Sequence, residues 1–123
     1  MICATLINTQ TQTQRQTAFD RLTTVRLKGK PVDFVIVQVY MPTTDYKDEE
    51  VDAVYERIEE LLDKETKAKD YMLVMGDWNA VVGEGKKDMF VGHYGLRYRN
   101  DSGEKLVEFC KRGLIYMTNS WFT

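Results

Sequence analysis

The 123-residue sequence has few cysteines and no long apolar run, and each shortage excludes a class of protein. Cys3 and Cys110 lie too far apart for a metal-ligand spacing, and two cysteines argue against a disulfide framework and favour a reducing compartment. No apolar run approaches the roughly 18 residues that a membrane span needs. No basic segment followed by an apolar stretch opens the chain, so no secretory signal is predicted. We therefore expect an intracellular protein, nuclear or cytoplasmic, without a membrane partner.

The sequence also lacks the positive charge that is typical of a nucleic-acid-binding domain. It has 17 basic and 19 acidic residues and a net charge of -2. Eleven of the acidic residues lie between Asp45 and Asp70, and the rest of the chain has 12 basic against 8 acidic residues. An acidic segment on one side of the fold can leave the opposite side attractive to phosphate.

Residues 9–17 are threonine and glutamine except for Arg15, so this segment has little to bury. We expect a flexible or irregular lead-in over residues 1–20 and a single domain over residues 21–123. Within the domain, an apolar segment with Leu22 and Leu27, a Gly/Pro turn and the run 34–40 predict two strands. Because run 34–40 is nearly continuous in apolar residues, we expect a strand covered on both faces.

The next segment is predicted to be a helix, because its apolar residues have the spacing that forms one stripe on a helix surface. They are Val51, Val54, Tyr55, Ile58, Leu61 and Leu62. Thr44 or Asp45 is the expected N-cap, and the acidic residues 48–50 suit the positive end of the helix dipole. Residues 71–75 then predict a buried strand ending at Gly76, and residues 80–99 a long loop of the kind that often carries function.

A second helix is expected after the loop, followed by a last strand. Asp101 and Glu104 have the spacing of a capping box, and Gly113 is the expected C-terminal stop. Cys110 lies on the apolar stripe of this helix, so we expect it to be a small core residue and not a nucleophile. Residues 114–118 predict the strand. The order of strands and helices indicates a layered α/β domain.

The sequence Gly76-Asp77-Trp78-Asn79 is the sharpest candidate site. It follows a buried strand, and the carboxyl ends of strands are where α/β proteins usually bind ligands. A carboxylate there can orient water or help to hold a metal, and a carboxamide can hydrogen-bond a phosphate oxygen. The alternative is a polar turn, because Gly, Asp and Asn all favour turns.

Three segments in order support the first interpretation. Val39-Tyr40-Met41-Pro42 ends one strand, Gly76-Asp77-Trp78-Asn79 ends the next, and Thr118-Asn119-Ser120-Trp121-Phe122 follows the last. This succession, over residues 21–122, resembles the endonuclease/exonuclease/phosphatase family. Residues 37–45 are most similar to retrotransposon-derived endonuclease domains and to a host protein of that descent. The resemblance implies a DNase I-like layered α/β sandwich.

The same resemblance implies a Mg²⁺-dependent endonuclease that acts on DNA. Asp77 would orient or activate the attacking water, Asn79 would hold the scissile phosphate, and Tyr40 would set its phenol against that phosphate or pack at the strand end. Trp78 is expected to pack in the core. Trp121 and Phe122 would line the nucleic-acid face or pack near the chain end.

The sequence departs from the family at both ends, so we expect a partial sandwich that lacks terminal strands. The family has a metal-binding Glu near its start, and no Glu precedes Arg21 here. It ends with a Ser-Asp-His segment, whereas the only histidine, His93, lies in the middle loop and matches no family motif. One carboxylate supplies too few ligands for Mg²⁺.

We therefore expect a fragment of a DNA phosphodiesterase that is weak or inactive alone. The alternative is a non-catalytic module that reuses the fold to bind nucleic acid, a protein partner or the remainder of the domain. A branch of the family that acts on lipid or inositol phosphates is a third interpretation, which the sequence around Tyr40 disfavours.

Overall fold

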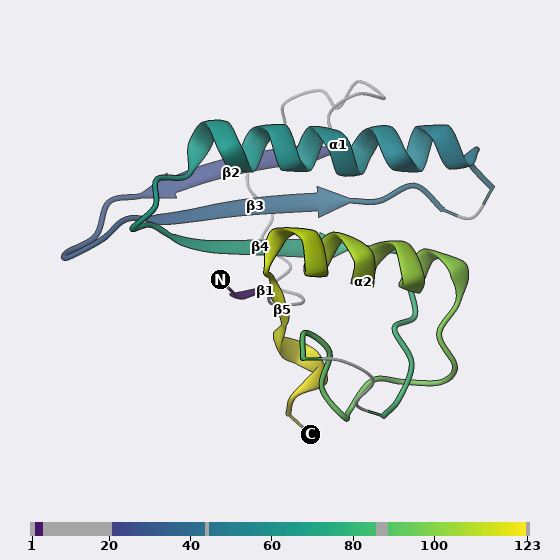
Figure 1. Cartoon of the computed structure of the whole chain (residues 1–123). Coiled ribbons are helices and arrows are strands. Elements are labelled where there is room, and N and C mark those ends of the chain that lie inside the picture. Colours follow the sequence, from purple (N-terminus) through teal and green to yellow (C-terminus); the bar gives the residue numbers. More distant parts are fainter. Residues whose placement is uncertain (1, 4–20, 44, 86–88, 123) are drawn as a thin grey trace.

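The computed structural model describes residues 2–3, 21–43, 45–85 and 89–122, which form an α/β fold with one sheet (Figure 1). The strands are β1 (Ile2–Cys3), β2 (Leu22–Leu27), β3 (Phe34–Tyr40), β4 (Tyr71–Asp77) and β5 (Tyr116–Met117). Their order in the sheet is β2-β3-β4-β1-β5, with β2 antiparallel to β3 and the other pairs parallel. The helices are α1 (Asp48–Glu65), α2 (Asp101–Gly113) and the short 3-10 helix η1 (Thr118–Ser120). The predicted α/β class is confirmed.

The sequence does not predict strand β1, which lies between β4 and β5. Ile2 is in register with Leu73 on one side and with Tyr116 on the other. A two-residue strand is too short to produce a hydrophobic period, so its sequence has no recognisable signal. The rest of the predicted lead-in, residues 1 and 4–20, lies outside the described residues.

Helices α1 and α2 cover one face of the sheet, as Figure 1 shows. Val35, Val37 and Val39 point toward them and are buried, together with Met72 and Val74 of β4. The predicted stripe of α1 is confirmed, since its buried residues are Tyr55, Ile58 and Leu62. Within the described ranges, no helix is long and apolar enough to cross a membrane.

Among the described residues the other face of the sheet is open, which corrects the expectation that run 34–40 is covered on both faces. Alternate residues of a strand point to opposite faces, and on β3 Phe34 is 48% and Tyr40 54% exposed. Val25 of β2 and Tyr71 of β4 are similarly exposed on the same face. The rings of Phe34 and Tyr71 stack there with centroids 5.2 Å apart. An apolar surface of this kind usually marks an interaction site.

Both predicted helix caps differ from the observed ones. Helix α1 begins after Lys47, which makes no side-chain capping bond, so neither Thr44 nor Asp45 is its N-cap; Thr44 itself lies outside the described residues. The N-cap of α2 is Asn100, whose side chain accepts a hydrogen bond from the Gly103 backbone at 2.8 Å. No capping box starts at Asp101, because Asn100 already occupies the cap position.

The end of α2 is also one residue later than predicted. Gly113 is the last helical residue, and Leu114 takes the left-handed conformation with φ 52°. The backbone N–H of Ile115 then donates to the Cys110 carbonyl at 2.8 Å, which closes the helix end. Consequently β5 contains only Tyr116–Met117 of the predicted strand 114–118, and the chain turns into η1.

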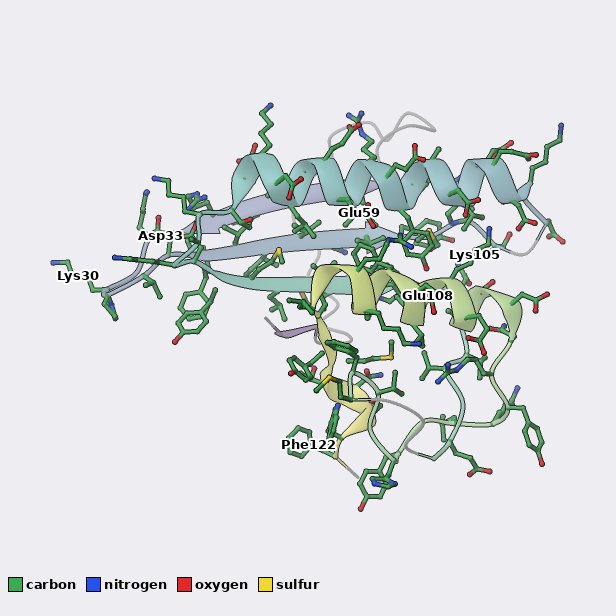
Figure 2. All side chains as sticks on the ribbon, in the orientation of Figure 1. Lys30, Asp33, Glu59, Lys105, Glu108 and Phe122 are labelled. Atoms are coloured by element: carbon green, nitrogen blue, oxygen red, sulfur yellow. The ribbon has the colours of Figure 1, made fainter. Side chains whose placement is uncertain are left out.

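Charged side chains join the elements at two places, partly visible in Figure 2. At one end of the sheet, Arg26 Nη1 lies 3.1 Å from Asp33 and 2.8 Å from Asp70, and Arg26 also donates to the Glu65 carbonyl. Between the helices, Arg112 of α2 lies 2.8 Å from Glu59 of α1. These pairs fix the helices and strand ends far from the carboxyl edge of the sheet.

Candidate functional site

Tyr40 and Asp77 lie side by side at the carboxyl edge of the sheet. They are the last register pair of the parallel β3–β4 ladder. Tyr40 is 54% exposed and Asp77 is exposed as well, and both point to the open face. The predicted pair is therefore brought together by strand register alone.

Gly76 explains why the two strand ends approach so closely. Its φ is 146°, and a Cβ atom at this position would lie 1.8 Å from the Val39 carbonyl oxygen. Any other residue at this position would push the backbone of β4 away from the backbone of β3, because Cβ atoms in real structures do not come so close to another atom. The Gly-Asp pair therefore places the Asp77 carboxylate beside the end of β3.

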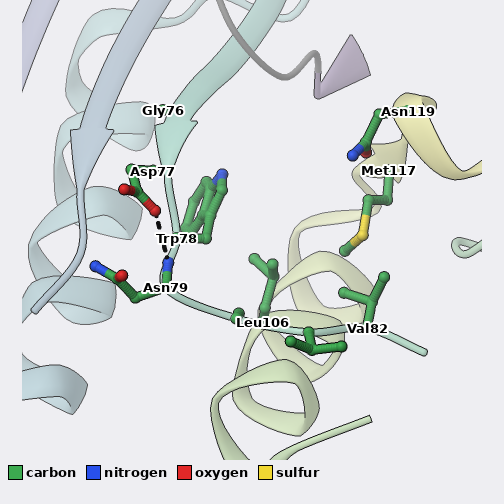
Figure 3. A pocket seen from close by; sticks show the side chains of 10 residues that line it. Gly76, Asp77, Trp78, Asn79, Val82, Leu106, Met117 and Asn119 are labelled. Atoms are coloured by element: carbon green, nitrogen blue, oxygen red, sulfur yellow. Dashed lines mark hydrogen bonds between the residues drawn. The ribbon is translucent and has the colours of Figure 1, made fainter. Parts of the chain in front are cut away.

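Two hydrogen bonds hold Asn79 at the same edge, and Figure 3 draws the one to Asp77. Its backbone N–H donates to the Asp77 carboxylate at 3.0 Å, and its side-chain Nδ2 donates to the Met41 carbonyl at 2.7 Å. The Met41 N–H in turn donates to the Asp77 carbonyl at 2.8 Å. Asn79 has φ 46°, a left-handed conformation that Asn tolerates better than most residues. A carboxamide nitrogen has two hydrogens, and the bond to Met41 uses one.

A cavity of about 470 Å³ is lined by Asp77 and Asn79, by the segment 80–82 that follows them and by Leu106 of α2. Figure 3 shows its two sides: Asp77 and Trp78 on one, Met117 and Asn119 on the other. The apolar wall is made by Trp78, Val82, Leu106 and Met117. The cavity therefore combines an apolar wall with polar groups at the ends of two strands, which is typical of a ligand site.

Asn119 is a cavity residue that the sequence does not single out as a site. It directly follows the predicted strand 114–118, and its position after a strand end is the signal that could have found it. The observed strand β5 is shorter than predicted, and η1 presents Asn119 across the cavity from Trp78.

The other candidate side chains have different surroundings. Trp78 is 9% exposed and packs against Tyr55 and Phe109, with ring centroids 6.1 and 5.8 Å apart, so its predicted place in the core is confirmed. Phe122 is 75% exposed, whereas Trp121 is half-buried. His93 is exposed in the middle loop and does not line the cavity beside Asp77.

A metal-ligand set is not assembled by the described residues. Among them, no three or more His, Cys, Asp or Glu side chains lie close enough together to hold a metal ion. Asp77 is the single carboxylate among the described residues that line the cavity, and one carboxylate by itself does not complete the octahedral ligand shell of Mg²⁺.

Comparison with known proteins gives one clear similarity. The chain is 38% identical over 103 residues to a protein of Bos taurus and 34% identical over 103 residues to one of Tragulus javanicus. Both are craniofacial development protein 2. In each case the match covers 84% of this chain. No family model and no solved structure matches the chain.

Craniofacial development protein 2 is much longer than the matched segment. The chain spans 17% of the Bos taurus protein and 18% of the Tragulus javanicus protein. Craniofacial development protein 2 is the host protein that residues 37–45 were expected to resemble, so that part of the sequence prediction is confirmed. Membership of the endonuclease/exonuclease/phosphatase family, and the DNase I-like sandwich that it implies, stay predictions.

Proposed function

We propose that this chain is part of a DNase I-like nuclease domain of the endonuclease/exonuclease/phosphatase family, directed at DNA phosphodiester bonds. The observation that carries the proposal is the placement of Tyr40, Asp77 and Asn79 at one edge of the sheet. Three polar groups of different chemistry converge there, beside a cavity. The similarity to craniofacial development protein 2 supports the sequence resemblance from which the proposal began.

Each group has a distinct task in this proposal. The second N–H of Asn79 donates to a non-bridging phosphate oxygen, while the bond to Met41 keeps the carboxamide in place. The Tyr40 phenol donates to the same phosphate. The Asp77 carboxylate accepts a hydrogen bond from the attacking water and orients it toward phosphorus. Such positioning is effective because the donors are fixed before the substrate arrives.

The chain alone is expected to be weak or inactive. Hydrolysis of a phosphodiester needs a charge that stabilises the developing anion, and the family supplies it with Mg²⁺. We propose that the remaining ligands and the general base come from outside the described residues. Removal of members of a catalytic set that acts as a unit leaves only residual catalysis.

Nicking of supercoiled plasmid in the presence of Mg²⁺ tests this proposal, with the purified chain beside its Asp77→Ala variant. We expect only trace nicking by the chain, and loss of that trace in the variant. Vigorous nicking that disappears in Asp77→Ala would show that the chain is sufficient for catalysis. Equal, substantial nicking by both proteins would remove Asp77 from the mechanism.

A second candidate function is a non-catalytic module that reuses the fold. The open apolar face of the sheet, with Val25, Leu27 and Phe34 about half exposed, favours a protein partner or the remainder of a larger domain. Salt-sensitive DNA binding that is unchanged by Asp77→Ala would indicate retained nucleic-acid binding. Association with a protein that does not depend on salt would indicate an interaction role.

A further inference from the structure

The described parts of the loop that follows the candidate site, residues 80–85 and 89–99, are held in place by backbone hydrogen bonds and close backbone contacts. Glu84 N donates to the Arg97 carbonyl at 2.9 Å, and Tyr94 N donates to the Ser120 carbonyl at 2.8 Å. Gly95 packs so closely that a Cβ there would lie 1.8 Å from the Gly83 carbonyl oxygen. The segments around residues 83, 95 and 120 therefore hold one another in place.

Ser120 and Arg99 extend this framework on either side. The buried Ser120 hydroxyl accepts from Gly92 N at 2.7 Å and donates to the Met117 carbonyl at 2.6 Å. Arg99 Nε donates to the Val82 carbonyl at 2.8 Å. A loop held by this many contacts costs little ordering entropy when it binds a ligand.

A second cavity, of about 420 Å³, lies within this framework. Its side-chain wall includes Val82, Tyr94, Leu96, Arg97 and Asn119. Asn119 and residues 80–82 line this cavity as well as the one at Asp77. The two cavities are therefore neighbours that share part of their lining.

The side chains of the second cavity are exposed although their backbone is fixed. Tyr94 is 53% and Leu96 79% exposed, and Arg97 is exposed beside them. A tyrosine ring has a flat face on which a base can stack, and a guanidinium is both charged and planar. A carboxamide can donate and accept hydrogen bonds at the edge of a base. These are the groups that proteins use to bind unpaired bases.

We propose that this cavity binds a nucleobase of single-stranded or locally unpaired DNA. The base stacks on Tyr94 against Leu96, Asn119 hydrogen-bonds its edge, and Arg97 attracts the adjacent phosphate. The inference rests on the proposed function, because the segment 80–82 that follows Asn79 lines this cavity as well as the one at Asp77.

An exposed cation at this cavity agrees with a polyanionic ligand. Arg97 lines the cavity and is exposed, whereas the Arg99 guanidinium is largely buried and lies 3.3 Å from Glu104. An exposed cation on an acidic protein attracts a nucleic acid to that side of the molecule. An acidic peptide would share the charge but would not need the flat tyrosine face.

Fluorescence anisotropy with a labelled 20-nucleotide single strand tests the proposal on the whole chain. Stacking on one aromatic ring is worth about 1–3 kcal/mol, so Tyr94→Ala should weaken binding at least about fivefold. Tyr94→Phe keeps the ring and should bind within about twofold of the unmodified chain. Tyr71→Ala, which removes a 54% exposed tyrosine at the opposite end of β4, is the matched control and should bind normally.

An oligonucleotide with abasic spacers in place of nucleosides separates base contacts from phosphate contacts. Tyr94→Ala should bind this probe as the unmodified chain does, whereas an Asn79 variant should lose affinity for both probes. Equal binding of the base-containing strand by Tyr94→Ala and the unmodified chain would overturn the base site, as would no binding of that strand at all. An Asn79 variant with normal affinity would instead contradict the proposed phosphate contact and leave the base site standing. Unchanged urea midpoints of the Tyr94 variants exclude unfolding as the cause. The Asn79 variant is expected to be less stable, so its far-UV circular dichroism spectrum in the binding buffer must match that of the unmodified chain.

Discussion

The Asn79 carboxamide nitrogen lies 2.7 Å from the Met41 carbonyl oxygen and so joins the ends of two adjacent strands. The contact bridges 38 positions of sequence and fixes the side chain that we propose for phosphate binding. Asn79 also has φ 46°, which few residues adopt without strain. Structure and candidate function therefore depend on the same residue.

We predict that Asn79→Ala and Asn79→Gly destabilise the fold to different extents. Both lose the hydrogen bond, which contributes about 1 kcal/mol. Alanine adds about 1 kcal/mol of left-handed strain that glycine avoids. Urea unfolding should therefore order the midpoints as unmodified chain, Gly variant and Ala variant. A less stable Gly variant would show that backbone strain is not important here.

Gly103 should not tolerate alanine, although it lies in a helix. Alanine usually stabilises an exposed helical position by up to about 1 kcal/mol relative to glycine. Here the Cβ would lie 1.9 Å from the Val81 carbonyl oxygen, so the loop that carries the cavity must shift. We expect a loss of about 2 kcal/mol or more for Gly103→Ala by urea unfolding, within the range of overpacked sites. Ser102→Ala in the same turn is the control. The close contact would be refuted if Gly103→Ala left the free energy of unfolding unchanged or raised it.

Acid should weaken the fold through Asp33. The hydrogen bonds from the Lys28 side chain and the Gly29 N–H, with a further contribution from Arg26, lower the pKa of Asp33 from 3.8 to about 2. Because the folded pKa is the lower one, ionised Asp33 stabilises the fold above pH 3.8, and this contribution disappears as the pH falls toward 2. The hydrogen bond from the Lys67 N–H, with a further one from Arg26, also lowers the pKa of Asp70, so Asp70 contributes to stability with the same sign.

Asp33→Asn tests this dependence. The variant should be less stable at pH 7 than the unmodified chain, and its urea midpoint should fall less between pH 4 and pH 2. Lys28→Met keeps the carboxylate and removes the hydrogen bond from the Lys28 side chain, and should raise the Asp33 pKa measured by carboxyl-carbon NMR. Parallel midpoint curves for Asp33→Asn and the unmodified chain would contradict the assignment.

The open sheet face should bind apolar probes. Phe34→Gln removes one ring of the Phe34–Tyr71 stack and should lower both the fluorescence of bound anilinonaphthalene sulfonate and any self-association by size-exclusion chromatography. Leu114→Gln is the matched control, since Leu114 is 67% exposed but lies at the end of α2. An equal decrease in both variants would show that the probe does not report on the sheet face.

The sequence predicts the long elements because their hydrophobic periods are strong. β2, β3, β4, α1 and α2 all occur where the period indicates, and Asp77, Asn79 and Tyr40 meet because their strands are parallel neighbours. The hydrophobic period did not reveal which face of the sheet stays exposed. Run 34–40 has apolar residues on both faces of the strand, and this pattern is the same whether or not another element covers the second face.

Features that depend on tertiary contacts are missed for physical reasons. Asn100 caps α2 because it also accepts from Val81 N at 3.0 Å, a contact between segments 19 positions apart. The left-handed end of α2 occurs at Leu114 although Gly113 has the better intrinsic preference. Asn119 reaches the cavity only because β5 stops early and η1 turns it inward.

Binding of duplex DNA by Asn79→Asp tests the central claim most directly. The change preserves the shape of the side chain but replaces its donor with a negative charge. Both the bond to the Met41 carbonyl and the proposed phosphate contact are then lost, and affinity should fall about tenfold or more. Lys30→Gln changes the net charge by the same amount at the far end of the sheet, where Figure 2 labels Lys30, and should cost less than about threefold. A tenfold loss in Asn79→Asp alone supports a phosphodiester site at this edge. Equal affinities of the two variants would contradict it.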